Sequence, residues 1–522
     1  MWTIDRILKW GEETKEGEIR GNRHLVIGGY SINTQTLQSS EIFIALQGNR
    51  CDGHSFIQEA FQKGASGAMV SRAWFQASSM ASDLLAHHFF ILVDDPLIGL
   101  QSLAGWHRNQ FSVPVIGITG SNGKTTTKEM LASILSRRGP VLKNEGNFNN
   151  GIGLPLTLLR LSSDHRLVVL EMGISQPGEM RRLCTIAKPT AGLITNIGPA
   201  HLEFLGDLSG VAMEKQVLFD SIPKNGAVIV NDDDPYLSKW TGDVLEKWTY
   251  AVHKGADLTA MDITQSAAGT TFTLQLDRHH SGGGGKQKIV LSLLGAHQVY
   301  NAMAASATAL ALGYEFDDIR DGLRQMRPIP LRGEVIHALG ATIFLDAYNA
   351  NAESIKSALQ TLVSAFEGSS ASLRTTGGFD SLANTSMESS SSLLGSGACL
   401  PVATCVRGLF ATPRRGRKVA ILGDMLELGE TARKSHLEVG RMVVQNGIDR
   451  LIVVGKWSAF VAQGAKEKGM LKEAISIYKD IKEVNLALEI KEGDIVLIKG
   501  SRGMGMEQAL SSFLKKDCAD AV

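Results

Sequence analysis

A glycine-containing loop at residues 120–126, Gly-Ser-Asn-Gly-Lys-Thr-Thr, carries the sharpest chemical signal in the chain. An apolar run at 112–118 predicts a buried strand before it, and residues 125–138 predict a helix after it. In that setting Lys124 can contact the β- and γ-phosphates of a nucleotide, and the Thr125 hydroxyl can ligate Mg²⁺. The full phosphate-loop pattern fails at Ile118, so a glycine-rich turn with a solvated lysine is the alternative. The order strand, loop, helix favours nucleotide contacts from Gly120, Ser121, Asn122, Gly123, Lys124, Thr125 and Thr126.

Three further polar residues follow predicted strands or lie on a predicted helix. Glu171 comes directly after the apolar run 167–170, where a carboxylate in a parallel sheet faces the ligand crevice and suits Mg²⁺. A surface glutamate is the alternative, and the neighbouring phosphate loop favours the metal. His201 and Lys215 are by default a structural histidine and a solvated lysine, and spacing alone assigns neither.

The C-terminal half holds two more polar clusters. Asp346 and Asn349 follow the apolar run 343–345, where they suit ribose or phosphate contacts or, equally, a helix cap. Residues 499–503, Lys-Gly-Ser-Arg-Gly, follow another apolar run and predict an anion-binding loop. His297 and Asn301 share one helical face, compatible with an adenine contact or with an exposed polar face.

These residues depend on buried strands that alternate with helices, which predicts an α/β fold. We expect an N-terminal domain at 1–112, a central domain with a parallel sheet at 113–326 and a C-terminal Rossmann-like domain at 327–522. Strands at 271–276 and 289–293 predict a hairpin with a glycine-rich tip. The Ser-, Thr- and Gly-rich stretch 367–417 interrupts the α/β pattern and predicts a disordered insertion.

Composition narrows the class of protein. The 522 residues predict about three domains. Lys plus Arg and Asp plus Glu are each 53, so the basic surplus typical of nucleic-acid binders is absent. Five scattered cysteines without a CxxC motif fit a reducing cytosol. The apolar runs are far shorter than the ~18 residues of a membrane span, so we expect a cytoplasmic protein that does not cross a membrane.

The ordered set of motifs resembles the Mur ligases of peptidoglycan synthesis, and among them the MurF type. The matching stretches lie at 119–127, 144–159, 171–173, 196–203, 295–302, 332–334, 346–351, 423–429 and 499–503. Residues 41–70 resemble the N-terminal module of the family. Asn-Phe-Asn-Asn-Gly-Ile-Gly and Asp-Ala-Tyr-Asn-Ala-Asn favour the MurF type, and the Asp-Asn-Pro-Arg of the MurE type is absent.

The resemblance implies an ATP- and Mg²⁺-dependent amide ligase that adds D-Ala-D-Ala to UDP-MurNAc-tripeptide through an acyl phosphate, working as a monomer in the cytoplasm. It implies Lys124, Glu171, His201 and Lys215 as catalytic residues, with His201 on a second Mg²⁺ and Lys215 carbamylated. Metal ligands would then be Thr125, Glu171, His201 and carbamylated Lys215. Further ATP contacts would come from His297, Asn301, Arg332, Asp346 and Asn349. Substrate contacts would come from Asn147, Asn149, Asn150, Lys499, Ser501 and Arg502.

The sequence departs from the family at two motifs. Asn33-Thr34-Gln35 stands where Asp-Ser-Arg is usual, so an arginine that would pair with substrate charge is absent. Ala352 replaces a usual proline. Alternative functions are a sibling ligase of the MurE type, a folylpolyglutamate-synthetase-like ligase, or a nucleotide-binding regulator without ligase activity.

Overall fold

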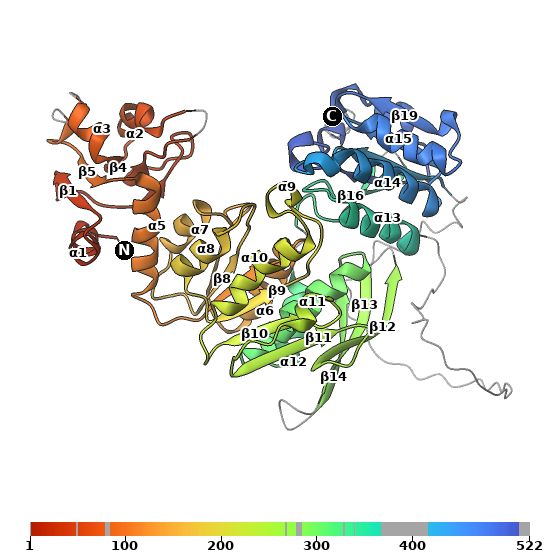
Figure 1. Cartoon of the computed structure of the whole chain (residues 1–522), viewed down its shortest axis with the longest axis horizontal. Coiled ribbons are helices and arrows are strands. Elements are labelled where there is room, and N and C mark those ends of the chain that lie inside the picture. Colours follow the sequence, from red (N-terminus) through yellow and green to blue (C-terminus); the bar gives the residue numbers. More distant parts are fainter. Residues whose placement is uncertain are drawn as a thin grey trace, which may run out of the picture. The chain divides into compact units, whose positions relative to one another are not determined.

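The structure is a computed structural model that describes residues 2–48, 51–78, 84–266, 269–277, 284–326, 329–338, 340–366 and 416–510. These residues form a three-domain α/β fold with one sheet in each domain (Figure 1). Two compact units contain them. The first is Met1–Ile329 with Ala350–Ser357 and Met425–Ser435, and the second is Pro330–Asn349 with Ala358–Asp424 and His436–Val522. The boundaries expected at 112/113 and 326/327 stay predictions.

The N-terminal domain holds a five-stranded sheet in the order β1-β5-β4-β3-β2. Only β1 runs antiparallel to its neighbour. The strands are β1 (Glu18–Gly21), β2 (Gly29–Ser31), β3 (Glu41–Ile44), β4 (Gly67–Ser71) and β5 (Phe89–Val93). The helices are α1 (Ile4–Thr14), α2 (Ile57–Gln62), α3 (Arg72–Ala77) and α5 (Pro96–Arg108). The β5 run Phe-Phe-Ile-Leu-Val is buried throughout, as expected for a strand covered on both faces.

The central domain is built on nine strands in the order β14-β13-β12-β11-β10-β9-β6-β8-β7. They are β6 (Val115–Thr119), β7 (Val141–Lys143), β8 (Leu167–Glu171), β9 (Ala191–Ile194), β10 (Ala227–Asn231), β11 (Glu246–Ala251), β12 (Leu258–Ser266), β13 (Gly269–Leu276) and β14 (Gly285–Leu291). The strands from β7 to β12 are parallel, and β13 and β14 continue the sheet as antiparallel strands.

Helices cover both faces of the parallel part of this sheet. They are α6 (Lys124–Leu135), α7 (Gly153–Leu158), α8 (Glu179–Ala187), α9 (Leu202–Leu205), α10 (Leu208–Asp220), α11 (Ala296–Ala311) and α12 (Phe316–Gln325). Alternate strand residues enter two separate cores: Ile116 packs with α6, α11 and α12, whereas Val115 packs with α5, α8 and α10. This two-sided burial explains the continuous apolar runs of β6 and β8.

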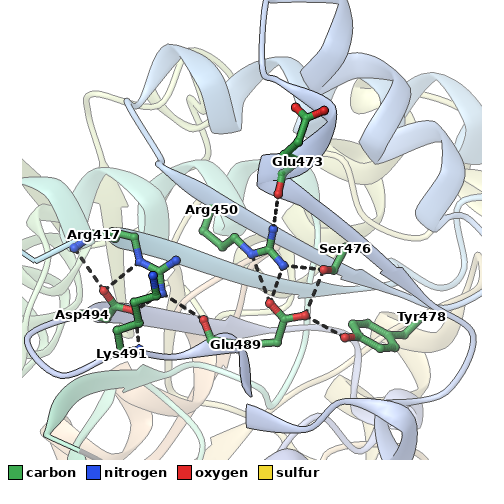
Figure 2. Close-up of polar contacts among 8 residues, drawn as sticks. All are labelled: Arg417, Arg450, Glu473, Ser476, Tyr478, Glu489, Lys491 and Asp494. Carbon is green, nitrogen blue, oxygen red and sulfur yellow. Dashed lines mark hydrogen bonds and ion pairs between the residues drawn. The ribbon is translucent and has the colours of Figure 1, made fainter. Parts of the chain in front are cut away.

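The C-terminal domain holds six strands in the order β15-β16-β20-β17-β18-β19, with only β15 antiparallel. They are β15 (Glu334–Ala338), β16 (Ala341–Leu345), β17 (Lys418–Gly423), β18 (Arg450–Val454), β19 (Ile475–Tyr478) and β20 (Ile495–Lys499). The helices are α13 (Ala352–Phe366), α14 (Ala432–Gln445), α15 (Ser458–Glu467) and α16 (Leu486–Glu489). A network of ion pairs and hydrogen bonds, from Arg417 to Asp494, ties the starts of β17 and β18 to the chain before β20 (Figure 2).

The apolar runs located the strands well. The predicted strand at 112–118 is confirmed as β6, although it begins three residues later, and the helix predicted at 125–138 is confirmed as α6 with a 3₁₀ turn (Ser136–Arg138). The hairpin is confirmed as β13 and β14, and its second strand begins earlier than predicted, at Gly285. Most of its tip, residues 278–283, lies outside the described residues, as does the predicted insertion up to residue 415.

Candidate active site

The loop between β6 and α6 has the backbone of a phosphate cradle. Gly120 and Gly123 adopt φ values of +146° and +82°, which residues with a side chain rarely adopt. A Cβ atom on Gly120 would lie 1.9 Å from Thr195 Oγ1, and one on Gly123 would lie 2.2 Å from Asn301 Oδ1. Glycine is therefore required at both positions, and the helix that follows begins at Lys124.

The loop after β9 holds the phosphate loop in place. Ser121 N donates to Asn196 O at 3.0 Å, and Asn122 N donates to Asn196 Oδ1 at 3.0 Å. Ser121 Oγ and Gly198 exchange two hydrogen bonds of 2.8 Å each. Asn196 belongs to a motif of the resemblance, but this supporting role was not predicted, since the contact spans 74 residues of sequence.

Lys124 lies over the phosphate loop, and the two residues after it are buried. Its Nζ donates to Gly120 O at 2.8 Å, so the ammonium group lies against the backbone of the loop. Thr125 and Thr126 are 6% and 5% exposed. The predicted phosphate-binding residues 120–126 are thus brought together in one turn of chain.

Glu171 ends β8 beside this loop, because its strand partner is Ile118 of β6. The side chain is 3% exposed. Its Oε1 accepts a hydrogen bond from Asn149 Nδ2 at 2.8 Å, whereas its Oε2 is buried without a hydrogen bond among the described residues. Leaving a buried carboxylate oxygen open is unfavourable unless another ligand satisfies it.

That open oxygen fits a divalent cation. Mg²⁺ is commonly held by one or two carboxylates together with phosphate oxygens and water, rather than by a cage of protein groups. Accordingly, within the described ranges no three His, Cys, Asp or Glu side chains converge as a metal-binding group. Glu171 and the Thr125 hydroxyl are the groups of this chain that would hold the ion next to the nucleotide.

The asparagines expected to meet substrate lie on the chain between β7 and α7. Asn149 is the one that contacts Glu171, and its backbone oxygen also accepts from Gly173 N at 2.8 Å. Asn150 Oδ1 accepts from the N–H groups of Ile152 and Gly153 at 3.1 and 3.0 Å, so it supports the start of α7. Asn147 is exposed. The contact between Asn149 and Glu171 joins the expected substrate loop to the expected metal ligand.

Lys215 and His201 bring two further titratable groups toward Lys124. Lys215, on α10, is 2% exposed, and burial, together with the charge of Lys124, holds its pKa well below the ordinary value of 10.5. Burial also lowers the pKa of His201; the Glu427 carboxylate, 3.0 Å from its Nδ1, opposes that shift, whereas Lys215 and Lys124 add to it. Lys124, Lys215 and His201 therefore share one electrostatic environment.

His297 and Asn301 both lie on α11, and Asn301 reaches the phosphate loop. Asn301 Oδ1 lies 3.3 Å from Thr127 Oγ1, and Asn301 Nδ2 donates to Gln298 Oε1 at 2.9 Å. His297 Nδ1 lies 2.8 Å from Ser357 Oγ. The alternative of an exposed polar face is wrong for Asn301, which is 5% exposed.

The second unit holds the remaining expected site residues. Lys499 is 2% exposed, and its Nζ donates to Asp346 Oδ2 at 2.6 Å and to Asn349 O at 3.0 Å. The Arg332 guanidinium stacks on Tyr348, with its Cζ 3.9 Å from the ring centroid. Ser501 N donates to Asp424 O, whereas Arg502 is exposed and pairs with Glu507 at 2.6 Å. Lys499 is therefore a buried lysine whose hydrogen bonds stabilise the turn at residues 346–349.

Comparisons with known proteins agree with this geometry. Residues 118–309 match the Mur ligase middle domain, and residues 402–502 match the Mur ligase, glutamate ligase domain. The chain is 34% identical to a UDP-N-acetylmuramoyl-tripeptide–D-alanyl-D-alanine ligase of Bacillus subtilis, over 98% of this chain and 99% of that protein. It is 31% identical to the Escherichia coli protein of the same name, over 95% and 96%.

Solved structures show the same architecture. A MurF crystal structure from Acinetobacter baumannii superposes with a TM-score of 0.78 at 26% identity, covering 98% of this chain and 99% of that one. The MurF ligase of Thermotoga maritima in complex with ADP gives 0.71 at 26% identity, covering 93% and 97%. The chain belongs to the Mur ligase family, and within that family to the MurF type. None of the described helices combines the length and apolarity that a membrane crossing requires.

Proposed function

We propose that this chain joins D-alanyl-D-alanine to UDP-N-acetylmuramoyl-tripeptide, with ATP converted to ADP and phosphate. The observation that carries the proposal is the open, buried oxygen of Glu171 beside the glycine loop at 120–126. The relatives at 31–34% identity over nearly the whole chain support the choice of substrates, because both bear the name of that ligase.

The reaction needs an activated acyl group, because a carboxylate is a poor acylating agent. A carboxylate oxygen of the tripeptide attacks the γ-phosphorus of ATP, and ADP leaves. The amine of D-alanyl-D-alanine then attacks the acyl carbon, phosphate leaves, and the nitrogen loses a proton. Bound Mg²⁺ would offset negative charge on the phosphates.

The residues of the chain have separate tasks in this scheme. The N–H groups and glycines of 120–123 hold and orient the phosphates, and the Lys124 ammonium stabilises charge on the transferring group. Glu171 and Thr125 hold the metal, and Asn149 orients the carboxylate of Glu171 by its 2.8 Å hydrogen bond. Asp346, Asn349 and Arg332 are proposed for ATP, as are His297 and Asn301. Asn147, Asn149, Asn150, Lys499, Ser501 and Arg502 are proposed for the substrates.

Lys215 is proposed as a carbamate that helps hold a second metal ion with His201. Carbamylation joins the neutral amine to CO₂ and releases one proton, so the amine must first be deprotonated. The lowered pKa of Lys215, caused by burial and by Lys124, supports that requirement. The product is an anion close to Lys124, which would stabilise it.

We further propose that the protein works in the cytoplasm as a monomer, supplying precursors for cell-wall growth and division. The name of the relatives gives one of their substrates as a UDP-linked muramoyl tripeptide, which supports this proposal. Size-exclusion chromatography with light scattering tests the monomer: a mass near 56.2 kDa is expected, and a mass near twice that value would contradict it.

A phosphate-release assay tests the function directly. Purified protein with ATP and UDP-MurNAc-tripeptide should release phosphate rapidly only after D-alanyl-D-alanine is added. Release with diaminopimelate and the UDP-MurNAc-dipeptide, or with glutamate and a folate, would instead indicate a MurE-type or folylpolyglutamate-synthetase-like ligase. Tight ATP binding with no release on any substrate would indicate a regulator.

A further inference from the structure

Lys128 is a buried cation next to the site that the proposed mechanism leaves without a task. It lies one helical turn after Lys124 on α6, and its side chain is 1% exposed. Its Nζ donates to Asn144 O at 2.7 Å and lies 3.1 Å from Glu129 Oε1. It also lies 4.0 Å from the open Oε2 of Glu171, which is too far for a hydrogen bond. A buried ammonium group requires such partners, because its desolvation is costly.

Asn144, whose backbone oxygen accepts a hydrogen bond from Lys128, forms two hydrogen bonds with the backbone of Glu171. Asn144 Nδ2 donates to Glu171 O at 2.8 Å, and Asn144 Oδ1 accepts from Glu171 N at 2.9 Å. Five residues later, Asn149 donates to the Glu171 carboxylate and accepts from Gly173 N. The loop 144–149 is thus joined at both ends to the end of β8, and Lys128 is bonded to its first residue.

The positive charge of Lys128 only partly neutralises the negative charge of Glu171, because Lys128 also pairs with Glu129. Glu129 lies between Lys128 and Lys143 and forms an ion pair with each. The positive charge of Lys128 is therefore shared by Glu129 and Glu171. A fixed positive charge about 4 Å from the open oxygen of Glu171 lowers the attraction of that oxygen for a second cation.

We propose that Lys128 is a positioning residue of the ligation site, which fixes the loop of Asn147 and Asn149 to Glu171 and weakens the hold of Glu171 on a divalent cation. This inference rests on the proposed function, since it assigns that loop to the nucleotide-sugar peptide. It predicts that removing the charge of Lys128 tightens the binding of a divalent cation but raises the KM for UDP-MurNAc-tripeptide. Simple loosening of the site would instead weaken the binding of both.

Lys128→Met, which keeps the length of the side chain and removes its charge, is the test. Mn²⁺ binding in the presence of ADP, followed by electron paramagnetic resonance, should tighten by about threefold or more, since the repulsion is gone. The KM for UDP-MurNAc-tripeptide should rise by about tenfold, the typical effect of losing one hydrogen bond from a charged group. Lys143→Met is the matched control, because Lys143 pairs only with Glu129 among these groups. It should leave both constants within about twofold of wild type.

The proposal would be overturned if Lys128→Met bound Mn²⁺ more weakly and also had a higher KM. It would also be overturned if neither quantity changed and only the melting temperature fell. If Lys128→Met does not fold, Lys128→Gln is measured instead: its amide can still donate to Asn144 O without a charge, so Mn²⁺ binding should tighten while the KM for UDP-MurNAc-tripeptide stays near the wild-type value, and unchanged or weaker Mn²⁺ binding would overturn the proposal. The Mn²⁺ titration needs no turnover. A failure of the proposed function, seen as absent phosphate release by the wild type, is therefore distinguishable from a failure of this inference.

Discussion

Two buried carboxylates, Glu171 in the central domain and Glu489 in the C-terminal domain, differ in how completely their oxygens are hydrogen-bonded. Glu489 is 8% exposed, and both of its oxygens are fully engaged (Figure 2). Oε2 accepts from Arg450 Nε and Nη2 at 3.1 and 2.5 Å, and Oε1 accepts from Ser476 Oγ and Tyr478 OH at 2.9 and 2.7 Å. The Glu171 side chain is 3% exposed, and within the described part of the chain its carboxylate accepts one hydrogen bond, from Asn149.

The difference separates a structural carboxylate from one available for binding. Burial alone would raise the pKa of Glu489, but hydrogen bonds from Arg450, Tyr478 and Ser476 outweigh it and hold the pKa below 4.5. All of the binding capacity of Glu489 is used within the domain. At Glu171 one oxygen is left for a ligand, and the Lys128 ammonium group lies 4.0 Å from it. Substitutions at the two sites should therefore affect different properties.

The largest expected effect is that of Glu171→Gln on activity. We expect ligation to fall about a thousandfold, since losing about 4 kcal/mol of metal stabilisation corresponds to three factors of ten. The melting temperature should change little, because the amide keeps the shape and removes a poorly satisfied buried charge. Phosphate release and differential scanning calorimetry measure the two properties. A variant with near wild-type turnover would remove Glu171 from the metal site.

Lys215→Ala should reduce ligation almost as much as Glu171→Gln, but this loss should be partly reversed by added formate or acetate. As an ordinary lysine, Lys215 would repel metal, and its loss should be tolerated; as a carbamate, its loss should nearly abolish ligation. We expect inactivity in plain buffer and partial recovery with formate or acetate, whose carboxylates replace the missing anion. Turnover at rising formate concentration is the measurement, with chloride at equal ionic strength as the control. Full activity without formate, or none with it, would count against the carbamate.

Glu489→Gln should instead affect stability. Breaking a buried ion pair costs about 3 kcal/mol or more, so the C-terminal domain should melt earlier while turnover per folded molecule at 25 °C stays near wild type. Glu473→Gln is the matched control, since only its backbone oxygen accepts from Arg450, at 2.6 Å, and its side chain points away (Figure 2). Calorimetry of both variants decides, and equal melting temperatures would show that the network adds nothing.

The lowered pKa of Glu489 also predicts how the stability difference between wild type and Glu489→Gln depends on pH. Because the pKa of Glu489 is lowered in the folded protein, its contribution to stability is fully present above the unfolded value near 4.5. It is lost as the pH falls through the lower, folded value. The gap in melting temperature between wild type and Glu489→Gln should therefore narrow below pH 4.5, and a gap that widens in acid would contradict the assignment.

The smallest effect is expected from removing the Ser-rich stretch. Its sequence contains too little apolar surface to offset the entropy of ordering, so replacing residues 369–413 by a short Gly/Ser bridge should leave turnover and melting temperature nearly unchanged. Arg417 must be kept, because it pairs with Asp494 at 2.6 Å where β17 begins. A large loss of either property would show that the stretch packs or binds something.

The local parts of this account could be predicted from sequence, and the tertiary parts could not. Apolar runs located β6, β8, β10 and β20 because both faces of these strands are buried. Short or half-exposed strands such as β7 and β19 lack that signal. The phosphate loop is contained in seven consecutive residues, so its chemistry could be inferred directly.

The partners of Glu171 are a different case. Asn144 and Asn149 lie 27 and 22 residues away from it, and only the pairing of β6, β7 and β8 brings them together. Lys128 is typical of a solvated helical lysine by sequence, and its 1% exposure follows from the packing of α6 against the sheet. Likewise, the four hydrogen bonds to the carboxylate of Glu489 come from three residues on two strands, Arg450 on β18 and Ser476 and Tyr478 on β19.

The central claim is that the open oxygen of Glu171 holds a divalent cation beside the nucleotide. Mn²⁺ binding with ADP present, measured by electron paramagnetic resonance on wild type, Glu171→Gln and Glu489→Gln, tests it most directly. We predict that Glu171→Gln weakens the Mn²⁺ site at least tenfold, which corresponds to about 1.4 kcal/mol, while Glu489→Gln binds as the wild type does. Equal Mn²⁺ affinity in wild type and Glu171→Gln would contradict the account.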